Sequence, residues 1–263
     1  MSFLATLLLA YAAWALLLFL AQRRIIFPGG GPAPAGAETG VPGLRRFWID
    51  IGGGRVEAWF VPPEGGGPAP ALLFAHGNAE LIDHSVRDMA SFARSGIGVM
   101  LVEYPGYGRS GGSPSAASIE RGVLAAYDLL AAQPEVDRTR IVGYGRSLGA
   151  APIAALSRER ALAAMVLQSA FTSLRPFAHS YLLPGFLVRD PMDVEGPLRA
   201  FSGPLLLIHG ERDEVVPVAH GRMLAAAGQD VTFLTHGCGH NDCPPDWAAH
   251  VESVAAFLFE ILR

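Results

Sequence analysis

The pattern of hydrophobic and polar positions divides the chain into three parts. The first is an apolar run from Ser2 to Ala21 that contains no charged residue. The second, Gly29 to Gly43, is rich in glycine, proline and alanine and has no periodicity. From Arg45 onward, short apolar runs alternate with amphipathic stretches, which is the pattern of a folded domain.

The first run is long enough to cross a membrane as a helix, because about 20 apolar residues span ~30 Å of hydrocarbon. A cleaved signal peptide is the alternative, but the run lacks a basic n-region and a clean small-residue cleavage site. We therefore expect residues 1–24 to be a retained transmembrane anchor. Residues 25–44 are expected to be a linker that lets the domain stand off the bilayer. Arg23 and Arg24 favour a cytoplasmic domain by the positive-inside rule, with a periplasmic or other extracytoplasmic placement as the alternative.

The remaining residues, 45–263, are expected to form one α/β domain. Three glycines join two runs with strand character, which predicts an N-terminal hairpin. The expected strands are 45–51, 55–62, 71–75, 99–103, 140–144, 164–167, 205–208 and 231–234, and the expected helices are 81–94, 119–132, 148–156 and 247–262. A hairpin followed by repeated strand–helix units predicts a mostly parallel eight-stranded sheet flanked by helices. Ligands bind such sheets at the carboxyl ends of the strands.

Composition narrows the classes of function. The net charge is −4 and no basic cluster is present, so we expect no nucleic-acid partner. No pair of histidines has metal-ligand spacing with a carboxylate, so we expect neither a metal site nor another cofactor.

One serine stands where a backbone turn would make it a nucleophile. Ser147 is the centre of Gly145-Arg146-Ser147-Leu148-Gly149, a G-x-S-x-G pattern between an expected strand and an expected helix. In this context the hydroxyl lies at a sharp elbow, and the two glycines leave room for the turn. The N-terminus of the helix adds free N–H groups and the positive end of its dipole.

Asp213 and His240 are the expected acid and base beside this serine. Asp213 lies in a loop after an apolar strand, and His240 lies in a glycine-containing loop between the last strand and the last helix. The chain order serine, aspartate, histidine is the one used in sheets of this kind. His236, at a strand end, is the alternative base, whereas His76 and His209 are expected to be structural.

Two backbone N–H groups are expected to form an oxyanion hole. One belongs to Leu148, directly after the serine, and the other to Asn78, in the loop after strand 71–75. The side chain of Asn78 is in addition a candidate cap for a helix that begins near Ala79. Arg146 is expected to make a surface ion pair rather than to receive a substrate anion.

Five motifs together resemble those of the α/β-hydrolase family. They are HGNAE at 76–80, EYPGYGRSGG at 103–112, GYGRSLGA at 143–150, HGERDEVVP at 209–217 and GHND at 239–242. With the N-terminal run and the following Gln-Arg-Arg-x-x-Phe-Pro, they are most similar to membrane-anchored serine hydrolases of the BEM46 and ABHD13/ABHD17 type. The resemblance implies an ester or thioester hydrolase with the triad Ser147, Asp213 and His240. Because fold does not fix substrate, the family does not name the acyl group.

Two features depart from the resemblance. Cys238 and Cys243 flank the expected base, and their spacing allows either a small disulfide, typical of oxidising compartments, or two half-buried free thiols. We expect free thiols. The insertion between Ser169 and Pro204 is too short for a cap domain. Its apolar side chains predict a short lid over an acyl pocket, for small-molecule or lipid-like substrates or acylated protein, unless they only cover the sheet.

Two other functions stay open. A serine peptidase of the acylaminoacyl or prolyl type has the same triad order, but such enzymes usually carry a large extra domain for which 263 residues leave no room. A non-catalytic α/β-hydrolase-fold protein that binds a partner at the membrane typically lacks one triad residue. The sequence favours a membrane-anchored hydrolase that forms an acyl-enzyme on Ser147.

Overall fold

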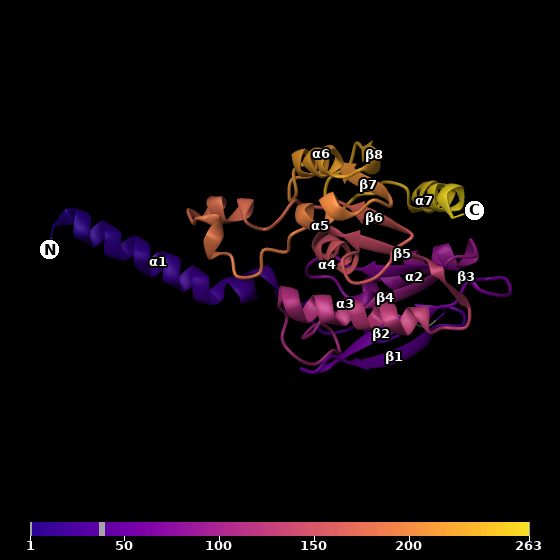
Figure 1. Ribbon diagram of the computed structural model, residues 1–263. Coiled ribbons are helices and arrows are strands. Elements are labelled where there is room, and N and C mark those ends of the chain that lie inside the picture. The colour runs from indigo at the N-terminus through magenta and orange to yellow at the C-terminus, as the bar shows by residue number, and fades with distance from the viewer. Residues whose placement is uncertain (1, 37–39, 263) are drawn as a thin grey trace.

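The computed structural model describes residues 2–36 and 40–262. An eight-stranded sheet with the order β1-β2-β4-β3-β5-β6-β7-β8 forms its centre (Figure 1). The strands are β1 (Arg45–Asp50), β2 (Arg55–Val61), β3 (Ala69–Ala75), β4 (Gly98–Val102), β5 (Val136–Arg146), β6 (Ala164–Gln168), β7 (Pro204–Gly210) and β8 (Asp230–His236). All eight expected strands are confirmed, and β3, β5, β6, β7 and β8 are longer than the apolar runs that predicted them.

The directions of the strands determine at which end of the sheet the candidate site lies. β2 runs antiparallel to both of its neighbours, β1 and β4, and all other neighbouring strands are parallel. The N-terminal hairpin therefore forms one edge of an otherwise parallel sheet, as expected. Because the strands from β3 to β8 point the same way, the loops that follow them gather at one end of the sheet.

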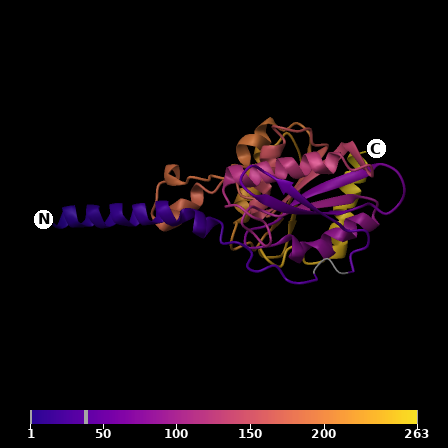
Figure 2. The same cartoon turned by 90° about the horizontal axis from the view of Figure 1, so that it is seen from below.

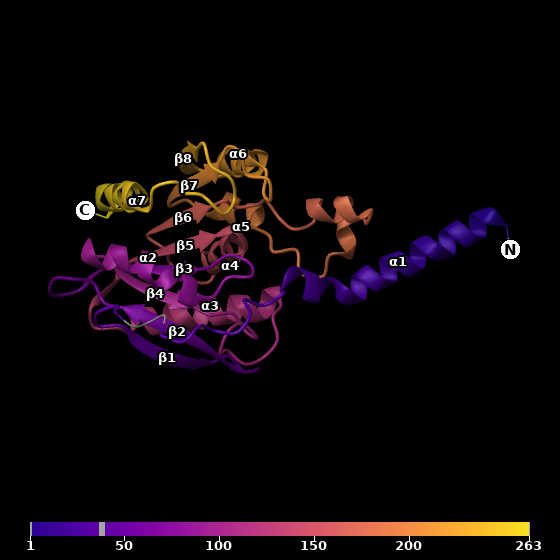
Figure 3. The same ribbon diagram turned by 180° about the vertical axis from the view of Figure 1, so that it is seen from behind.

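Helices cover both faces of the sheet (Figure 3). They are α2 (Ile82–Arg94), α3 (Ala116–Ala131), α4 (Ala150–Leu156), α5 (Glu195–Ala200), α6 (Val218–Ala227) and α7 (Trp247–Ile261). Buried side chains of α3, α4, α5 and α6 join one hydrophobic cluster, and those of α2 and α7 join the other. The expected mostly parallel sheet between two helical layers is thus confirmed. The sequence did not predict α5 or α6. In the case of α5, the helix is only six residues long and contains Gly196 and Pro197.

The N-terminal helix α1 (Phe3–Ile26) projects away from the domain (Figure 2). It is long and apolar enough to cross a membrane, and none of its residues is buried. Its C-terminal end, however, is docked on the domain. Phe27 is buried, and Asn78 Nδ2 donates to the carbonyl oxygen of Ile26 at 2.8 Å. Apolar burial and a hydrogen bond thus join the start of the expected linker, residues 25–44, to the domain.

The insertion between β6 and β7 carries two short 3-10 helices, η2 (Pro176–Tyr181) and η3 (Gly185–Leu187). We call residues 176–188 the lid segment. In all three views the lid segment lies outside the body of the domain and alongside α1 (Figures 1, 2 and 3).

Candidate active site

Ser147 lies on a strained turn between β5 and α4. Its φ is +50°, in the left-handed region that non-glycine residues rarely adopt. The single 3-10 turn η1 (Ser147–Gly149) leads from it directly into α4. Strain of this kind is typical of functional turns, and here it holds the serine hydroxyl at the carboxyl end of the central strand.

Two glycines make this turn sterically possible. A Cβ atom on Gly145 would lie 2.6 Å from Cα of Ala150. A Cβ atom on Gly149 would lie 2.0 Å from the carbonyl oxygen of Ala75, at the end of β3. Both positions therefore require glycine, and the close approach packs the start of α4 against two strands. The expected role of these glycines is confirmed.

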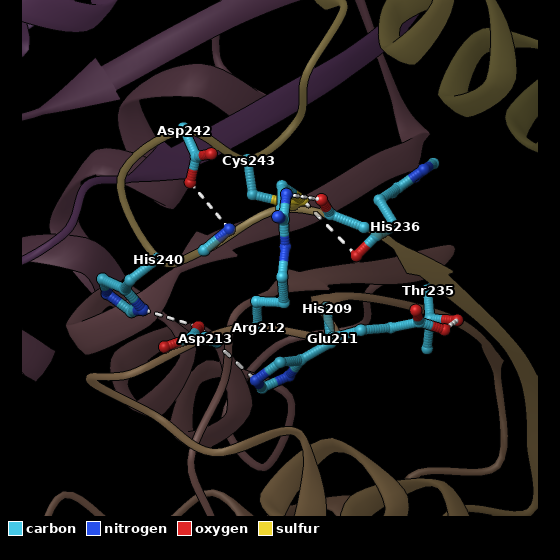
Figure 4. The surroundings of a disulfide bond; sticks show 12 residues. His209, Glu211, Arg212, Asp213, Thr235, His236, His240, Asp242 and Cys243 are labelled. Atoms are coloured by element: carbon cyan, nitrogen blue, oxygen red, sulfur yellow. Dashed lines mark hydrogen bonds and ion pairs between the residues drawn. A yellow bond between two sulfur atoms is a disulfide. The ribbon is translucent and has the colours of Figure 1, made fainter.

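The structure brings Ser147, His240 and Asp213 together. His240 Nε2 lies 3.0 Å from Ser147 Oγ. His240 Nδ1 lies 2.7 Å from Asp213 Oδ2 (Figure 4). All three side chains are buried. With the Nδ1–H donating to the carboxylate, Nε2 is left to accept the proton of the serine hydroxyl. His240, rather than the alternative His236, is hydrogen-bonded to the serine.

Hydrogen bonds hold Asp213 as a carboxylate. Burial alone would raise its pKa. The bond from His240 and two backbone N–H groups, those of Val215 at 3.0 Å and Val216 at 2.7 Å, outweigh burial and keep the pKa of Asp213 below its usual value. An ionised Asp213 fixes the tautomer of His240 and would stabilise an imidazolium if His240 took up a proton.

The two histidines expected to be structural make contacts of that kind. His209 Nε2 lies 2.8 Å from the carbonyl oxygen of Val216 and 3.6 Å from Asp213 Oδ2 (Figure 4). Burial lowers the pKa of His209, so it stays neutral at pH 7 and braces the loop that carries Asp213. His76 is fully buried and bonds Glu103 Oε1 and the carbonyl oxygen of Gly77, each at 2.8 Å.

Asn78 and Leu148, the expected oxyanion-hole residues, border the same cavity as Ser147. Leu148 directly follows the serine in η1, where its N–H has no preceding helical turn to accept it. Asn78 lies in the loop that follows β3. The structure thus brings both residues to the serine.

The side chain of Asn78 does not cap a helix. The helix α2 begins only at Ile82, with Leu81 at its N-cap. The Asn78 amide instead donates to the carbonyl oxygen of Ile26 and accepts from the Tyr107 hydroxyl at 3.0 Å. The capping alternative is therefore wrong, and the amide fixes the loop between the domain and the end of α1.

Arg146 joins the two loops that flank the serine. It forms an ion pair with Glu80 and donates through Nη2 to the carbonyl oxygen of His240 at 3.1 Å. The Glu80 carboxylate in turn accepts from the N–H of Gly77 at 3.0 Å. The expected ion pair exists, but it is not on the surface, since the Arg146 side chain is only 16% exposed. The sequence did not indicate that Arg146 would join Glu80 to the carbonyl oxygen of His240.

We expect Arg146→Gln to lower kcat for ester hydrolysis by about tenfold or more, because small displacements of a catalytic group are costly. Arg160→Gln, which loses an exposed pair with Asp128, is the matched control and should keep full activity. Arg146→Lys should recover part of the loss. Steady-state kinetics would contradict the bridging role if Arg146→Gln and Arg160→Gln behaved alike.

A disulfide joins Cys238 and Cys243, on either side of His240 (Figure 4). The expectation of free thiols is therefore wrong. The N–H of Gly239 donates to Asp242 Oδ1 at 2.7 Å, which closes a turn and brings the two cysteine Cα atoms to 5.2 Å, a normal separation for a disulfide. The loop that carries His240 is thus tied at both ends.

A row of buried, hydrogen-bonded polar side chains also anchors the loop that carries His240, at its Cys243 end. Gln168 Nε2 donates to the carbonyl oxygen of Cys243 at 2.8 Å, and the Tyr144 hydroxyl donates to Gln168 Oε1 at 2.7 Å. His250 Nε2 lies 2.7 Å from the same hydroxyl. Because the tyrosine proton goes to Gln168, His250 must donate through Nε2–H, and its buried Nδ1 has no hydrogen-bond partner among the described residues.

Burial, with a smaller contribution from His236, lowers the pKa of His250 to about 4. Its unfolded value is about 6.5, so the unfolded chain binds more protons between these two pH values. The stabilising effect of a neutral His250, about 3 kcal/mol, is therefore complete above pH 6.5 and is lost as the pH falls towards 4. We expect Tm in detergent to fall across this interval. His250→Gln, which keeps an N–H for Tyr144, should flatten the profile, and an unaltered profile in this variant would contradict the assignment.

An apolar cavity of about 350 Å³ opens at Ser147, a size typical of small-molecule sites. Two segments far apart in the sequence supply most of its walls. The residues that line it include Leu18, Gln22, Ile25 and Ile26 of α1, and Phe171, Phe177, Tyr181, Leu183 and Leu187 of the insertion. The insertion thus lines a pocket, as expected, but Leu182 and Phe186 point outward and are 76% and 80% exposed.

Comparisons with known proteins agree with this fold. No family model matches the chain. An uncharacterized protein of Mycobacterium tuberculosis, Rv2307c, is 36% identical over 249 residues, which cover 91% of this chain and 88% of that protein. The alpha/beta hydrolase domain-containing protein WAV2 of Arabidopsis thaliana is 33% identical over 221 residues, covering 73% of this chain and 70% of WAV2. Protein bem46 of Schizosaccharomyces pombe is 26% identical, covering 92% and 87%.

Among solved structures, Est1E of Butyrivibrio proteoclasticus with bound ferulic acid has a TM-score of 0.72 at 20% identity, covering 82% of this chain and 99% of Est1E. An esterase of Pyrococcus furiosus has a TM-score of 0.69 at 19% identity, covering 84% and 91%. These structures share the fold. Together with the identity and coverage of the relatives, the eight-stranded sheet and the serine elbow show that the chain belongs to the α/β-hydrolase family.

Proposed function

We propose that the protein is a serine hydrolase that cleaves carboxylic esters or thioesters through an acyl-enzyme on Ser147. The observation that carries this proposal is the hydrogen-bonded row of Ser147, His240 and Asp213 at an apolar cavity. An activated nucleophile requires a base in hydrogen-bond reach and a group that orients the base, and these distances meet both requirements. Membership of the α/β-hydrolase family supports the same conclusion.

In the proposed mechanism, His240 takes the proton of Ser147 as Oγ attacks the substrate carbonyl. The N–H groups of Asn78 and Leu148 stabilise the negative charge that develops on the carbonyl oxygen. His240 then gives its proton to the leaving alcohol or thiol, which departs and leaves the acyl group on Ser147. A water molecule deprotonated by His240 releases the acid and restores the serine. These steps need no cofactor.

A fluorophosphonate probe tests this proposal, because it reacts covalently with activated serines. The full-length protein in detergent should be labelled, whereas Ser147→Ala and His240→Ala should not be, and Asp213→Asn should label slowly. Failure of the folded wild-type protein to react would contradict the proposal and favour a non-catalytic binding protein.

We also propose that α1 is a retained membrane anchor rather than a cleaved signal sequence. Four of its residues line the cavity, and Arg23 Nε pairs with Asp190 at 2.7 Å. Cleavage after α1 would remove one wall of the substrate pocket. The intact mass of the protein purified from membranes should therefore include residues 1–26, and a mature chain that begins near Phe27 would contradict the assignment.

We propose that the domain lies on the extracytoplasmic side of the membrane. Disulfides persist in oxidising compartments, so Cys238–Cys243 favours an extracytoplasmic domain, against the placement expected from Arg23 and Arg24. Asp190 neutralises Arg23, which weakens the charge argument. Protease added to intact cells or spheroplasts should digest the domain, and protection from it would contradict this placement.

A further inference from the structure

The lid segment has the composition of a membrane-inserted element. Between Pro176 and Val188 the chain carries no Asp, Glu, Lys or Arg, and Arg175 and Arg189 flank the segment directly. A charge-free apolar stretch of about 10–14 residues is typical of interfacial or re-entrant segments. Leu182 and Phe186, at 76% and 80% exposed, turn their apolar surface away from the protein.

The lid segment lies along the part of α1 that would be inside the bilayer. The Gln22 amide donates to the carbonyl oxygen of Leu187 at 3.2 Å, and further along the helix the Tyr11 hydroxyl donates to the carbonyl oxygen of Leu182 at 3.0 Å. At a rise of about 1.5 Å per residue, the distance from Gln22 to Tyr11 is about 16 Å. That is about half of the ~30 Å hydrocarbon core. Figures 1 and 2 show the same side-by-side arrangement.

Charged residues lie at the domain end of both α1 and the lid segment, where the two would emerge from the hydrocarbon core. Arg23 pairs with Asp190, and the N–H of Arg189 donates to Gln22 Oε1 at 2.7 Å. The charges on α1 and those at the end of the lid segment thus lie at one level, next to the domain. Arginines at this level are typical of the membrane–water interface.

Several backbone groups of the lid segment have hydrogen-bond partners within the protein, as hydrocarbon would require. Polar backbone groups in lipid must find partners within the protein. Trp14 Nε1 donates to the carbonyl oxygen of Tyr181 at 3.0 Å, in addition to the Tyr11 bond. Within the segment, the N–H groups of Leu182, Leu183 and Leu187 donate to carbonyl oxygens of preceding residues.

We infer that the lid segment is inserted in the bilayer beside α1 and that the cavity takes the long acyl chain of a membrane lipid ester directly from the adjoining leaflet. The cavity supports this route, because α1 and the lid segment contribute much of its lining and Ser147 borders it. The acyl chain then reaches the serine without crossing water, which removes the cost of exposing its methylene groups. This inference rests on the proposed function and names its substrate class.

Lid variants test the route in the full-length protein reconstituted in phosphatidylcholine vesicles. Two substrates are compared, soluble p-nitrophenyl acetate and a fluorogenic long-chain glycerolipid ester held in the vesicles. Phe186→Glu should lower hydrolysis of the lipid ester at least tenfold and change hydrolysis of the acetate less than twofold. Phe259→Glu, at a 45% exposed position on α7, is the matched control and should affect neither.

An equal loss on both substrates, or no loss on either, would overturn the inference. Failure of the proposed function has a different signature, since the wild-type protein would then hydrolyse neither ester and would not react with a fluorophosphonate. In that case the insertion of the lid segment into the bilayer can still be tested by a separate measurement. A spin label on Phe186→Cys should be relaxed by oxygen, which dissolves in hydrocarbon, more than by a water-soluble nickel chelate. A label on Phe259→Cys should show the reverse, and a water-exposed label at 186 would overturn the inference.

Discussion

Ser147→Ala is expected to lower ester hydrolysis by about five orders of magnitude while leaving the fold intact. Loss of the nucleophile removes the acyl-enzyme route altogether, and the residual activity comes only from the oxyanion hole and substrate binding. Alanine is smaller than serine and loses one hydrogen bond, that to His240, so Tm should change little. The measurement is kcat/KM for p-nitrophenyl acetate, with Tm in the same detergent.

Ser169→Ala is the matched control. Ser169 also has a φ of +50°, follows the neighbouring strand β6 and is fully buried, but its hydroxyl has no hydrogen-bond partner among the described residues. Its replacement should therefore leave activity near the wild-type value. Comparable losses in the two serine variants would show that the turn, rather than the Ser147 hydroxyl, carries the effect.

Gly149→Ala is expected to destabilise the protein by about 3 kcal/mol or more and to abolish activity. The φ of Gly149 is −65°, which suits alanine, so the backbone conformation is not the cause. The cause is the added methyl group, which would lie 2.0 Å from the carbonyl oxygen of Ala75. Relief of this overlap must move either β3 or the turn that holds Ser147, and overpacking of this kind is costly. Tm should fall by about 10 °C.

Gly122→Ala provides the comparison with the same chemical change. Gly122 lies in α3, and the nearest atom to its added Cβ is 3.9 Å away, on Val56. Here alanine should raise stability by about 0.5–1 kcal/mol, because glycine is unfavourable inside a helix. A Gly149→Ala protein as stable and active as Gly122→Ala would contradict the close packing at the elbow.

Much of the sheet and of the candidate site could be predicted because their signals are local. Each buried strand is a short apolar run, and Ser147, Asp213 and His240 each lie in a glycine-containing loop next to such a run. In a parallel sheet, loops after different strands meet at one end. The predicted strands therefore also indicated that Ser147, Asp213 and His240, although far apart in the sequence, would lie close together.

The remaining features depend on contacts that local patterns do not contain. Arg146 bonds His240 across 94 positions, and Tyr11 bonds Leu182 across 171. Arg146 and His240 each lie in a motif, but neither motif indicates that the two residues are bonded, and Tyr11 and Leu182 lie in no motif. The disulfide depends on a turn closed by Asp242, and two thiols five positions apart look the same in sequence whether or not that turn forms. The docking of α1 was missed because the glycine-rich stretch after it resembles a flexible linker.

The most direct test of the central claim is to trap the acyl-enzyme. A carbamoylating nitrophenyl ester forms a serine adduct that hydrolyses slowly, so the modified residue can be identified by peptide mass spectrometry of the full-length protein. The account predicts release of one nitrophenol per protein and a single carbamoyl group on Ser147, both absent in Ser147→Ala. A carbamoyl group on another residue, or continued nitrophenol release with Ser147 unmodified, would contradict it.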